Sequence, residues 1–245
     1  NTLLGEVPEI KNFFVCAGLN SIGIGSGGGV GKVTAEWLMN GHINEDIFNY
    51  DIKRFQKFHS RLDFIKNRIT ETLGDLYGMH WPFKQHKTSR NIMVTPYYEE
   101  LKKAGACFGV TGGYERAMWF ARDNNKSEYE YSYNYQNWYP SAEFETKNAS
   151  ENVGLFDLTP FSKFEIQGEN AHEELQKLCT ANIKNEIGKC TYTQMLNSDG
   201  GIETDLTVVC LGKNHFRIIS SAATRERDKF HLKKCLPSDI ELKDV

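Results

Sequence analysis

The densest chemical signal in the chain is a run of glycines near its start, residues 23–32, which read GIGSGGGVGK. Glycine has no Cβ, so a run of this kind lets the backbone approach a ligand closely. A phosphate-binding P-loop needs Gly, four residues, and then Gly-Lys followed by Ser or Thr. If Gly31 and Lys32 are aligned with the Gly-Lys of this motif, Ser26 occupies the position of its first glycine. Val33 then occupies the position that requires Ser or Thr. The P-loop interpretation therefore fails at both ends.

Two other interpretations of the glycine run remain. Gly23, Gly25 and Gly28 satisfy G-x-G-x-x-G, but the dinucleotide fingerprint also needs a second strand ending in an acid about twenty residues later. Here a charged, helical stretch follows instead. The alternative is a glycine loop that brings a helix N-terminus to an electron-rich group such as a flavin ring oxygen. We favour this ligand contact over an empty turn, because five glycines between residues 25 and 31 exceed what a turn requires.

Asp205 is the acid with the best placement for chemistry. In an expected strand over residues 203–211, Glu203, Asp205 and Thr207 share one face. Its apolar neighbours predict partial burial, which raises the pKa of a carboxyl group. A solvated strand carboxylate is the commoner case for such a residue on its own.

No metal site is predicted from the spacing of histidines and cysteines. None of the seven histidines pairs at metal-ligand spacing with another His or Cys, and His80 and His86 come nearest. A Ser-His-Asp or Cys-His nucleophile lacks any local signature. The six cysteines are scattered without a C-x-x-C pair, which is typical of reduced thiols in an intracellular protein.

The elements that would position these residues follow from periodicity and turn signals. Helices are expected at 30–40, 51–73, 97–104, 171–181 and 224–234. Strands are expected at 13–17, buried on both faces, and at 106–110, 153–157, 163–166, 192–196, 203–211 and 216–220. Asp199-Gly200-Gly201 predicts a hairpin over residues 194–209. The pattern is that of a mixed α+β fold.

Four alternating tyrosines between residues 129 and 135 predict an extended segment with all four on one face. Stacking on nucleic-acid bases is disfavoured because residues 128–139 contain no Lys or Arg. We interpret the segment as aromatic packing near a domain boundary.

Composition excludes two classes of partner. The 245 residues are 40% hydrophobic with a net charge of −3, so no global field attracts nucleic acid or an anionic membrane. No apolar run approaches the length of a membrane span. The chain begins with Asn rather than Met, and we interpret it as a piece of a longer protein.

Several blocks in the same order resemble one family. Residues 13–41 are similar to the C-terminal return of the flavin domain in dimethylglycine and sarcosine dehydrogenases. The blocks YDIKRF at 50–55, ERAMWF at 115–120 and NWY at 137–139 resemble that family's middle region. Residues 154–168, 192–208 and 222–228 resemble its folate domain, which is related to the aminomethyltransferase (T-protein) of the glycine cleavage system.

The resemblance implies three regions and two sets of binding residues. The regions are 1–47, the C-terminal return of the FAD-binding oxidoreductase domain; 48–140, its central connecting region; and 141–245, the N-terminal part of an aminomethyltransferase-like folate-binding domain. FAD would contact Gly18, Asn20, Ser21, Gly23, Gly25, Gly27 and Gly28. Tetrahydrofolate would contact Tyr192, Met195, Asp205 and Ser221, with Asp205 as the catalytic residue.

The implied activity is that of an FAD-dependent oxidoreductase acting on CH–NH donors. The longer protein would oxidise the N-methyl group of a small amino acid and pass the one-carbon unit to tetrahydrofolate, with electron-transfer flavoprotein or oxygen as electron acceptor. The resemblance implies the mitochondrial matrix in a eukaryote and the cytoplasm otherwise, and an inactive isolated chain. The alternatives are a regulatory subunit of the same architecture, of the pyruvate dehydrogenase phosphatase type, and a folate-dependent aminomethyltransferase or demethylase.

Overall fold

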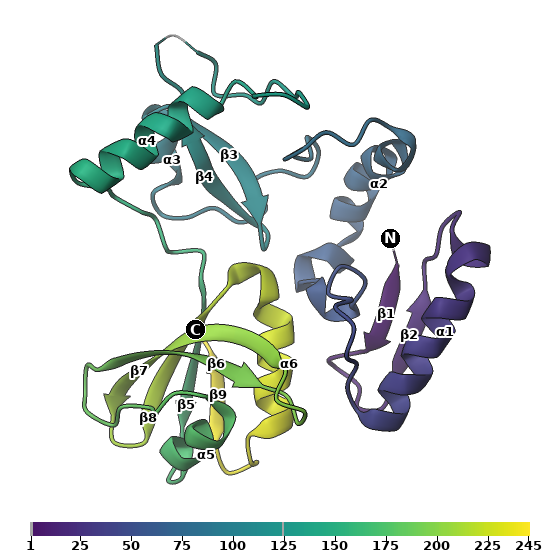
Figure 1. Ribbon diagram of the computed structural model, residues 1–245, viewed down its shortest axis with the longest axis vertical. Coiled ribbons are helices and arrows are strands. Elements are labelled where there is room, and N and C mark those ends of the chain that lie inside the picture. Colours follow the sequence, from purple (N-terminus) through teal and green to yellow (C-terminus); the bar gives the residue numbers. More distant parts are fainter. Residues whose placement is uncertain (1, 124) are drawn as a thin grey trace. The chain divides into compact units, whose positions relative to one another are not determined.

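A computed structural model describes residues 2–123 and 125–245, which form two compact units (Figure 1). Unit 1 combines the chain up to Gln56 with Phe161–Val245, and unit 2 is Lys57–Pro160. Both units mix helices with antiparallel strands, so the predicted α+β class is confirmed.

An antiparallel sheet with strand order β6-β7-β8-β5-β9 organises the C-terminal part of unit 1. Its strands are β5 (Ser162–Gln167), β6 (Cys190–Leu196), β7 (Ile202–Gly212), β8 (His215–Ser220) and β9 (Glu241–Asp244). The predicted hairpin is confirmed, because β6 pairs with β7 and Gln194 lies opposite Asp205. Side chains alternate between two faces along each strand, so one residue in two reaches the core.

The core of unit 1 lies on one face of this sheet. The helices α5 (Ala171–Leu178) and α6 (Arg225–Cys235) add Leu175 and Leu232 to a cluster that contains Phe164 and Ile218, all four with 0% exposure. A short 3₁₀ turn, η3 (Ala222–Thr224), precedes α6.

The N-terminal part of unit 1 corrects two expectations. The helix α1 (Gly23–Asn40) begins seven residues before the expected start, so the glycines lie inside the helix and not in a loop. Glycine weakens a helix by about 1 kcal/mol per residue, which is why the sequence favours a loop, yet the local fold overrides that preference. The strand β2 (Phe14–Ala17) pairs with β1 (Leu3–Glu6), which the sequence did not predict, and its residues are half-buried or exposed rather than buried on both faces.

Unit 2 consists of η2 (Lys57–Ser60), α2 (Leu62–Tyr77), α3 (Tyr98–Lys103), a hairpin of β3 (Ala106–Thr111) and β4 (Tyr114–Phe120), and α4 (Tyr139–Glu151). The expected helix over 51–73 is wrong in its first half. Asp51 accepts a hydrogen bond from the backbone N–H of Lys53 at 2.8 Å and caps the short η1 (Ile52–Arg54), after which Phe55 is extended. A continuous helix cannot pass through an extended residue.

Two further expectations in unit 2 are wrong. Residues 153–157 form no strand, and Val153, Leu155 and Phe156 are 87%, 98% and 71% exposed. Because strand hydrogen bonding needs a partner strand, an apolar run without one stays irregular. The tyrosine-rich segment is also irregular, with Tyr129 and Tyr131 stacked at a centroid distance of 5.7 Å.

Candidate functional site

The glycine-rich start of α1 is an open surface of backbone. Ile22 at the N-cap makes no side-chain cap, and the first turn contains no acidic residue. Gly18 and Ser21 have φ angles of 71° and 62°, so the turn before the helix uses the left-handed region. A Cβ added at Gly25, Gly27, Gly28, Gly29 or Gly31 would meet no atom within 4 Å.

These features fit an electron-rich ring or an anionic group. The first N–H groups of a helix have no intrahelical partner and carry the positive end of the helix dipole. The predicted FAD residues Gly23, Gly25, Gly27 and Gly28 lie in the first two turns, while Gly18, Asn20 and Ser21 lie in the turn before them. Bare backbone at the helix start therefore offers a flat ligand both close contact and free donors.

Of the predicted folate residues, Tyr192 and Asp205 lie together. The hydroxyl of Tyr192 donates a hydrogen bond to Asp205 Oδ2 at 3.1 Å across β6 and β7. Both are exposed, which corrects the expected partial burial of Asp205. The reason is the strand alternation itself: Thr204 and Leu206 take the core face, so Asp205 lies on the other.

The other two predicted folate residues are placed differently. Met195 is 0% exposed and lies in the core of unit 1, so it presents no surface to a ligand in this arrangement. Ser221 begins η3, where its Oγ accepts a hydrogen bond from the backbone N–H of Ala223 at 3.2 Å. Its position is thus explained by a local turn.

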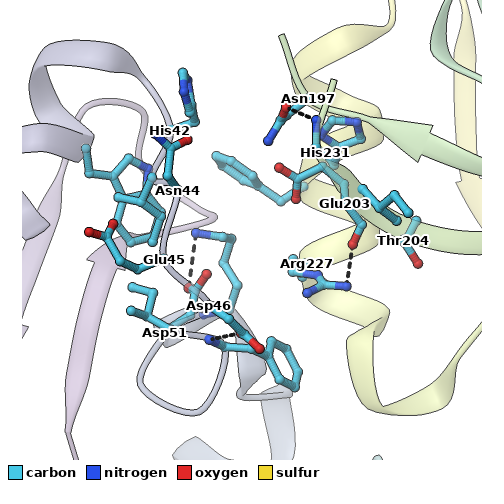
Figure 2. Close-up of a pocket in the computed structure, with 18 of the residues that line it drawn as sticks. His42, Asn44, Glu45, Asp46, Asp51, Asn197, Glu203, Thr204, Arg227 and His231 are labelled. Atoms are coloured by element: carbon cyan, nitrogen blue, oxygen red, sulfur yellow. Dashed lines mark hydrogen bonds and ion pairs between the residues drawn. The ribbon is translucent and has the colours of Figure 1, made fainter. Parts of the chain in front are cut away.

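A cavity of about 710 Å³ lies within unit 1, and Asp205 belongs to its lining (Figure 2). Residues 41–48 line one side, and the end of the β6–β7 hairpin and α6 line the other. The acids of the lining are Glu6, Glu45, Asp46, Asp51, Asp199, Glu203 and Asp205, and its permanent cations are Lys53, Arg227 and Lys234. The excess of acids over cations favours a cationic or neutral ligand over an anion.

Lys53 is a buried cation of the cavity that the sequence did not single out. It is 5% exposed, and its Nζ lies 3.1 Å from Asp51 Oδ1. The same Nζ lies 4.4 Å from the ring centroid of Trp37 and 5.1 Å from that of Phe230. A carboxylate and two aromatic faces together hold this ammonium group away from water. In the sequence, the signal for this ion pair is the position of Lys53 two residues after Asp51 in YDIKRF.

Asp228 is a second buried carboxyl of unit 1 besides Asp51, whereas Asp205 is exposed. Asp228 is 1% exposed, its Oδ2 accepts a hydrogen bond from Thr224 Oγ1 at 2.7 Å, and its Oδ1 has no hydrogen-bond partner among the described residues. Burial raises the pKa of this carboxyl to about 6, although the hydroxyl of Thr224 acts in the opposite direction. The sequence signal was its helical spacing from the core residue Leu232, one turn later on α6.

Two family models match the chain. Residues 97–245 match the GCVT N-terminal domain, and residues 40–95 match the FAD dependent oxidoreductase central domain. In a fold comparison, the crystal structure of glycine cleavage system aminomethyltransferase T from Bartonella henselae covers 63% of this chain and 38% of that chain, with a TM-score of 0.51 and 22% identity. That likeness supports the fold.

Three curated relatives are similar along most of the chain. A 4-methylaminobutanoate oxidase (formaldehyde-forming) from Paenarthrobacter nicotinovorans is 41% identical over 96% of the chain and 28% of its own length. The mitochondrial pyruvate dehydrogenase phosphatase regulatory subunit of Mus musculus is 33% identical over 98% of the chain and 28% of its own length. The mitochondrial sarcosine dehydrogenase of Homo sapiens is 31% identical over 87% of the chain and 26% of its own length.

The matches confirm the resemblance that the sequence blocks indicated. The chain spans about 26–28% of the length of these three relatives. Among the described residues, no helix combines the length and the apolar composition that crossing a membrane requires. Because the matched segment, residues 97–245, is more than half of the sequence, the chain belongs to the GCVT N-terminal domain family.

Proposed function

We propose that this chain is part of an FAD-dependent oxidoreductase that oxidises the N-methyl group of a small amino acid and passes the one-carbon unit to tetrahydrofolate. Support comes from the two family models, which pair an oxidoreductase domain with a GCVT domain. Two of the relatives, an oxidase and a dehydrogenase, are named for N-methylated amines.

The observation that carries this proposal is the uncapped, glycine-rich start of α1. A bound flavin supplies the hydride acceptor for such an oxidation. The residues of this chain would hold it: free N–H groups around Gly23 and Gly25 donate to its electron-rich edge, and the bare backbone at Gly27 and Gly28 lets the ring approach. Positioning and electrostatics are the contribution of the protein.

On the folate side the proposal rests on Tyr192 and Asp205. Bound tetrahydrofolate supplies the nitrogen that takes up the one-carbon unit. Asp205 accepts or holds a proton at its carboxylate, and the hydroxyl of Tyr192 fixes the orientation of that carboxylate through the bond at 3.1 Å. The aromatic ring of Tyr192, which is 63% exposed, offers a flat apolar surface to a pterin.

The remaining assignments belong to the same proposal. We keep the division into residues 1–47, 48–140 and 141–245, although the structure divides into compact units at residues 56 and 160. Electron-transfer flavoprotein or oxygen is the electron acceptor. In a eukaryote the protein is located in the mitochondrial matrix, and otherwise in the cytoplasm. Two of the relatives are named as mitochondrial, which supports the organelle.

The test uses the complete protein that contains this chain. The protein is mixed without oxygen with sarcosine, dimethylglycine or 4-methylaminobutanoate, and the loss of oxidised-flavin absorbance is followed. Formaldehyde and methylene-tetrahydrofolate are then measured with and without tetrahydrofolate. Flavin reduction by one of these amines, with a shift of product from formaldehyde to methylene-tetrahydrofolate, is expected. A protein that binds flavin but is reduced by none of them contradicts the proposal.

A second candidate, a regulatory subunit without turnover, is favoured by one specific observation. The pyruvate dehydrogenase phosphatase regulatory subunit is similar along 98% of the chain. The same experiment separates the two functions, since a regulatory subunit would retain the architecture and leave its flavin oxidised with every amine. Folate-dependent methyl transfer without flavin reduction would instead support the aminomethyltransferase alternative.

A further inference from the structure

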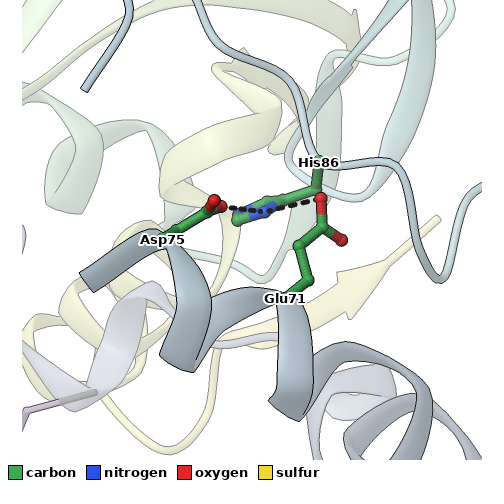
Figure 3. A group of neighbouring side chains, drawn as sticks. All are labelled: Glu71, Asp75 and His86. Carbon is green, nitrogen blue, oxygen red and sulfur yellow. Dashed lines mark ion pairs between the residues drawn. The ribbon is translucent and has the colours of Figure 1, made fainter. Parts of the chain in front are cut away.

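A group of metal-ligating side chains lies in unit 2, far along the sequence from the residues assigned above. Glu71 and Asp75 are one turn apart on α2, and His86 comes from the loop that follows the helix. Each offers one ligand atom, and these atoms all lie within 4.8 Å of one another. Figure 3 shows the imidazole of His86 between the two carboxylates.

The distances in this group suit a shared cation better than direct hydrogen bonds. His86 Nδ1 lies 3.5 Å from Asp75 Oδ2 and 3.8 Å from Glu71 Oε1. Hydrogen bonds from nitrogen to oxygen are typically about 2.7–3.2 Å long, so both contacts exceed that range. Two ligand atoms bound tetrahedrally to one Zn²⁺ at about 2.0–2.2 Å stand roughly 3.3–3.5 Å apart.

Glu71 and His86 are in the protonation states that coordination needs. Burial lowers the pKa of His86, and the nearby Arg68 lowers it further, so the imidazole is neutral at neutral pH. Burial of Glu71 would raise its pKa, but hydrogen bonds from the Thr88 hydroxyl and from the backbone N–H groups of Lys87 and Thr88 outweigh it and lower the pKa to about 2. Glu71 is therefore ionised.

Outer contacts hold both carboxylates in place. Lys84 Nζ pairs with Asp75 Oδ1 and leaves Oδ2 facing His86. Glu71 Oε2 accepts the N–H of Thr88 at 2.9 Å and also its hydroxyl, while Oε1 accepts the N–H of Lys87 at 2.6 Å and keeps a second lone pair. Hydrogen bonds of this kind orient metal-binding carboxylates.

Two cations face the same group and limit its affinity. Lys84 pairs with Asp75, and Arg68 Nε lies 3.8 Å from Glu71 Oε2. Their charges offset those of the two carboxylates, so binding is expected to be weaker than at a dedicated structural zinc site. The His86 side chain is 46% exposed, which leaves a path for an ion and room for water ligands.

We propose that Glu71, Asp75 and His86 bind one divalent first-row transition-metal ion, with Zn²⁺ as the type ion and water completing its coordination. One imidazole nitrogen with two carboxylate oxygens suits Zn²⁺ or Co²⁺ better than Mg²⁺ or Ca²⁺, which prefer oxygen alone. The ion ties the loop after α2 to the helix. Two carboxylates on one helix face and a distant histidine leave no His or Cys spacing pattern in the sequence.

The test is a metal titration of the chelator-treated chain. The exposed Cys16 and Cys190 also attract Zn²⁺, so all variants carry Cys16→Ser and Cys190→Ser. Calorimetry with Zn²⁺ is expected to give one ion per chain. Co²⁺ is expected to give visible ligand-field bands without a thiolate-to-cobalt charge-transfer band. Bound Zn²⁺ is also expected to raise the thermal midpoint, and excess chelator to reverse that rise.

Three variants make the assignment specific. His86→Gln is expected to weaken Zn²⁺ binding about 100-fold or more. Loss of a residue that only hydrogen-bonds to a metal ligand already lowers metal affinity about 10–100-fold. His80→Gln is the matched control, because His80 Nε2 lies 3.0 Å from the Asp75 carbonyl oxygen and His80 is not one of the three ligand side chains. His86→Cys retains a ligand and is expected to add the thiolate-to-cobalt band.

Several results would overturn the proposal. They are an absence of saturable one-to-one Zn²⁺ binding, an unchanged affinity in His86→Gln, and a His86→Cys spectrum without the new band in a chain whose circular dichroism matches the parent. An equal loss in His80→Gln and His86→Gln would likewise place the ion elsewhere.

Discussion

Tyr192 and Asp205 face each other on the exposed side of the β6–β7 hairpin, with the tyrosine hydroxyl donating to the Asp205 carboxylate at 3.1 Å. They are not direct partners in the strand ladder, since Tyr192 lies opposite Thr207 and Asp205 lies opposite Gln194. The contact is therefore a diagonal one, which only a side chain as long as tyrosine can make.

This pair leads to a prediction for the folate reaction. In the complete protein, Asp205→Asn is expected to leave flavin reduction unchanged and to lower the yield of methylene-tetrahydrofolate about 100-fold, because a proton acceptor is lost. Tyr192→Phe removes one orienting hydrogen bond and is expected to cost about fivefold. Thr207→Ser, on the same face, is the control. Stopped-flow flavin absorbance and product analysis measure both steps. An unchanged yield of methylene-tetrahydrofolate in Asp205→Asn would contradict the catalytic role assigned to Asp205.

A second prediction separates helix stability from flavin binding on α1. Gly28→Ala and Gly31→Ala each add a methyl group that meets no atom within 4 Å. Alanine favours a helix over glycine by about 1 kcal/mol, so each is expected to stabilise the isolated chain by up to that amount. In the complete protein, Gly28→Ala is expected to weaken flavin binding and Gly31→Ala to leave it intact. Thermal unfolding and flavin titration measure the two effects. Equal flavin affinity in both variants would refute the assigned contact at Gly28.

A third prediction concerns the pH dependence of folding through Asp228. Burial raises its folded pKa to about 6 from an ordinary value of 3.8. Between those values the folded chain binds a proton that the unfolded chain has released, so this group makes stability fall as pH rises through that window. Asp228→Asn cannot titrate. Its stability relative to the parent is expected to increase by on the order of 2 kcal/mol from pH 4 to pH 7.

Urea unfolding at several pH values measures this effect. Asp239→Asn, which removes an exposed carboxyl group, is the control for the same chemical change at the surface. If the free energy of unfolding depends on pH in the same way in Asp228→Asn and in the parent, the pKa of the Asp228 carboxyl is not raised in the folded chain.

A fourth prediction concerns the ion pair of Arg90 and Glu115 in unit 2. Glu115 is 2% exposed. Its carboxylate accepts hydrogen bonds from Arg90 Nε at 2.7 Å, from Arg90 Nη2 at 2.5 Å and from the backbone N–H of Asn91 at 2.8 Å. Arg90→Met leaves a buried charge without its partner and is expected to cost about 3–5 kcal/mol. The double variant Arg90→Met, Glu115→Leu is expected to recover part of that loss. Denaturant unfolding measures both, and a single variant within 1 kcal/mol of the parent would contradict the expectation.

Local pattern was sufficient for four of the five strands of the unit 1 sheet, β5 to β8, but β9 (Glu241–Asp244) was not predicted. The hairpin over residues 194–209 was predicted from its Asp-Gly-Gly turn, and the alternation along residues 203–211 correctly placed Asp205 opposite the face of Leu206. Both signals are short-range: turn chemistry and strand period depend on residues adjacent in the sequence.

Where the prediction failed, the deciding partner was distant or missing. The strand β1 was not predicted, although it completes the hairpin with β2, and residues 153–157 have strand composition but form no strand. The burial of Asp205 was also wrong. The apolar residues that flank Asp205 in the sequence occupy the opposite face of the strand.

The sequence by itself determined the family, the α+β class and the identity of the groups that could do chemistry. It carries the glycines of α1, the Tyr192–Asp205 pair and the order of the similar blocks. Only the tertiary structure decided that the glycines lie in a helix, that Asp228 is buried, and that His86 meets Glu71 and Asp75. The physical reason is that residue type and period are local properties. Burial and side-chain contacts depend on which distant segments pack together.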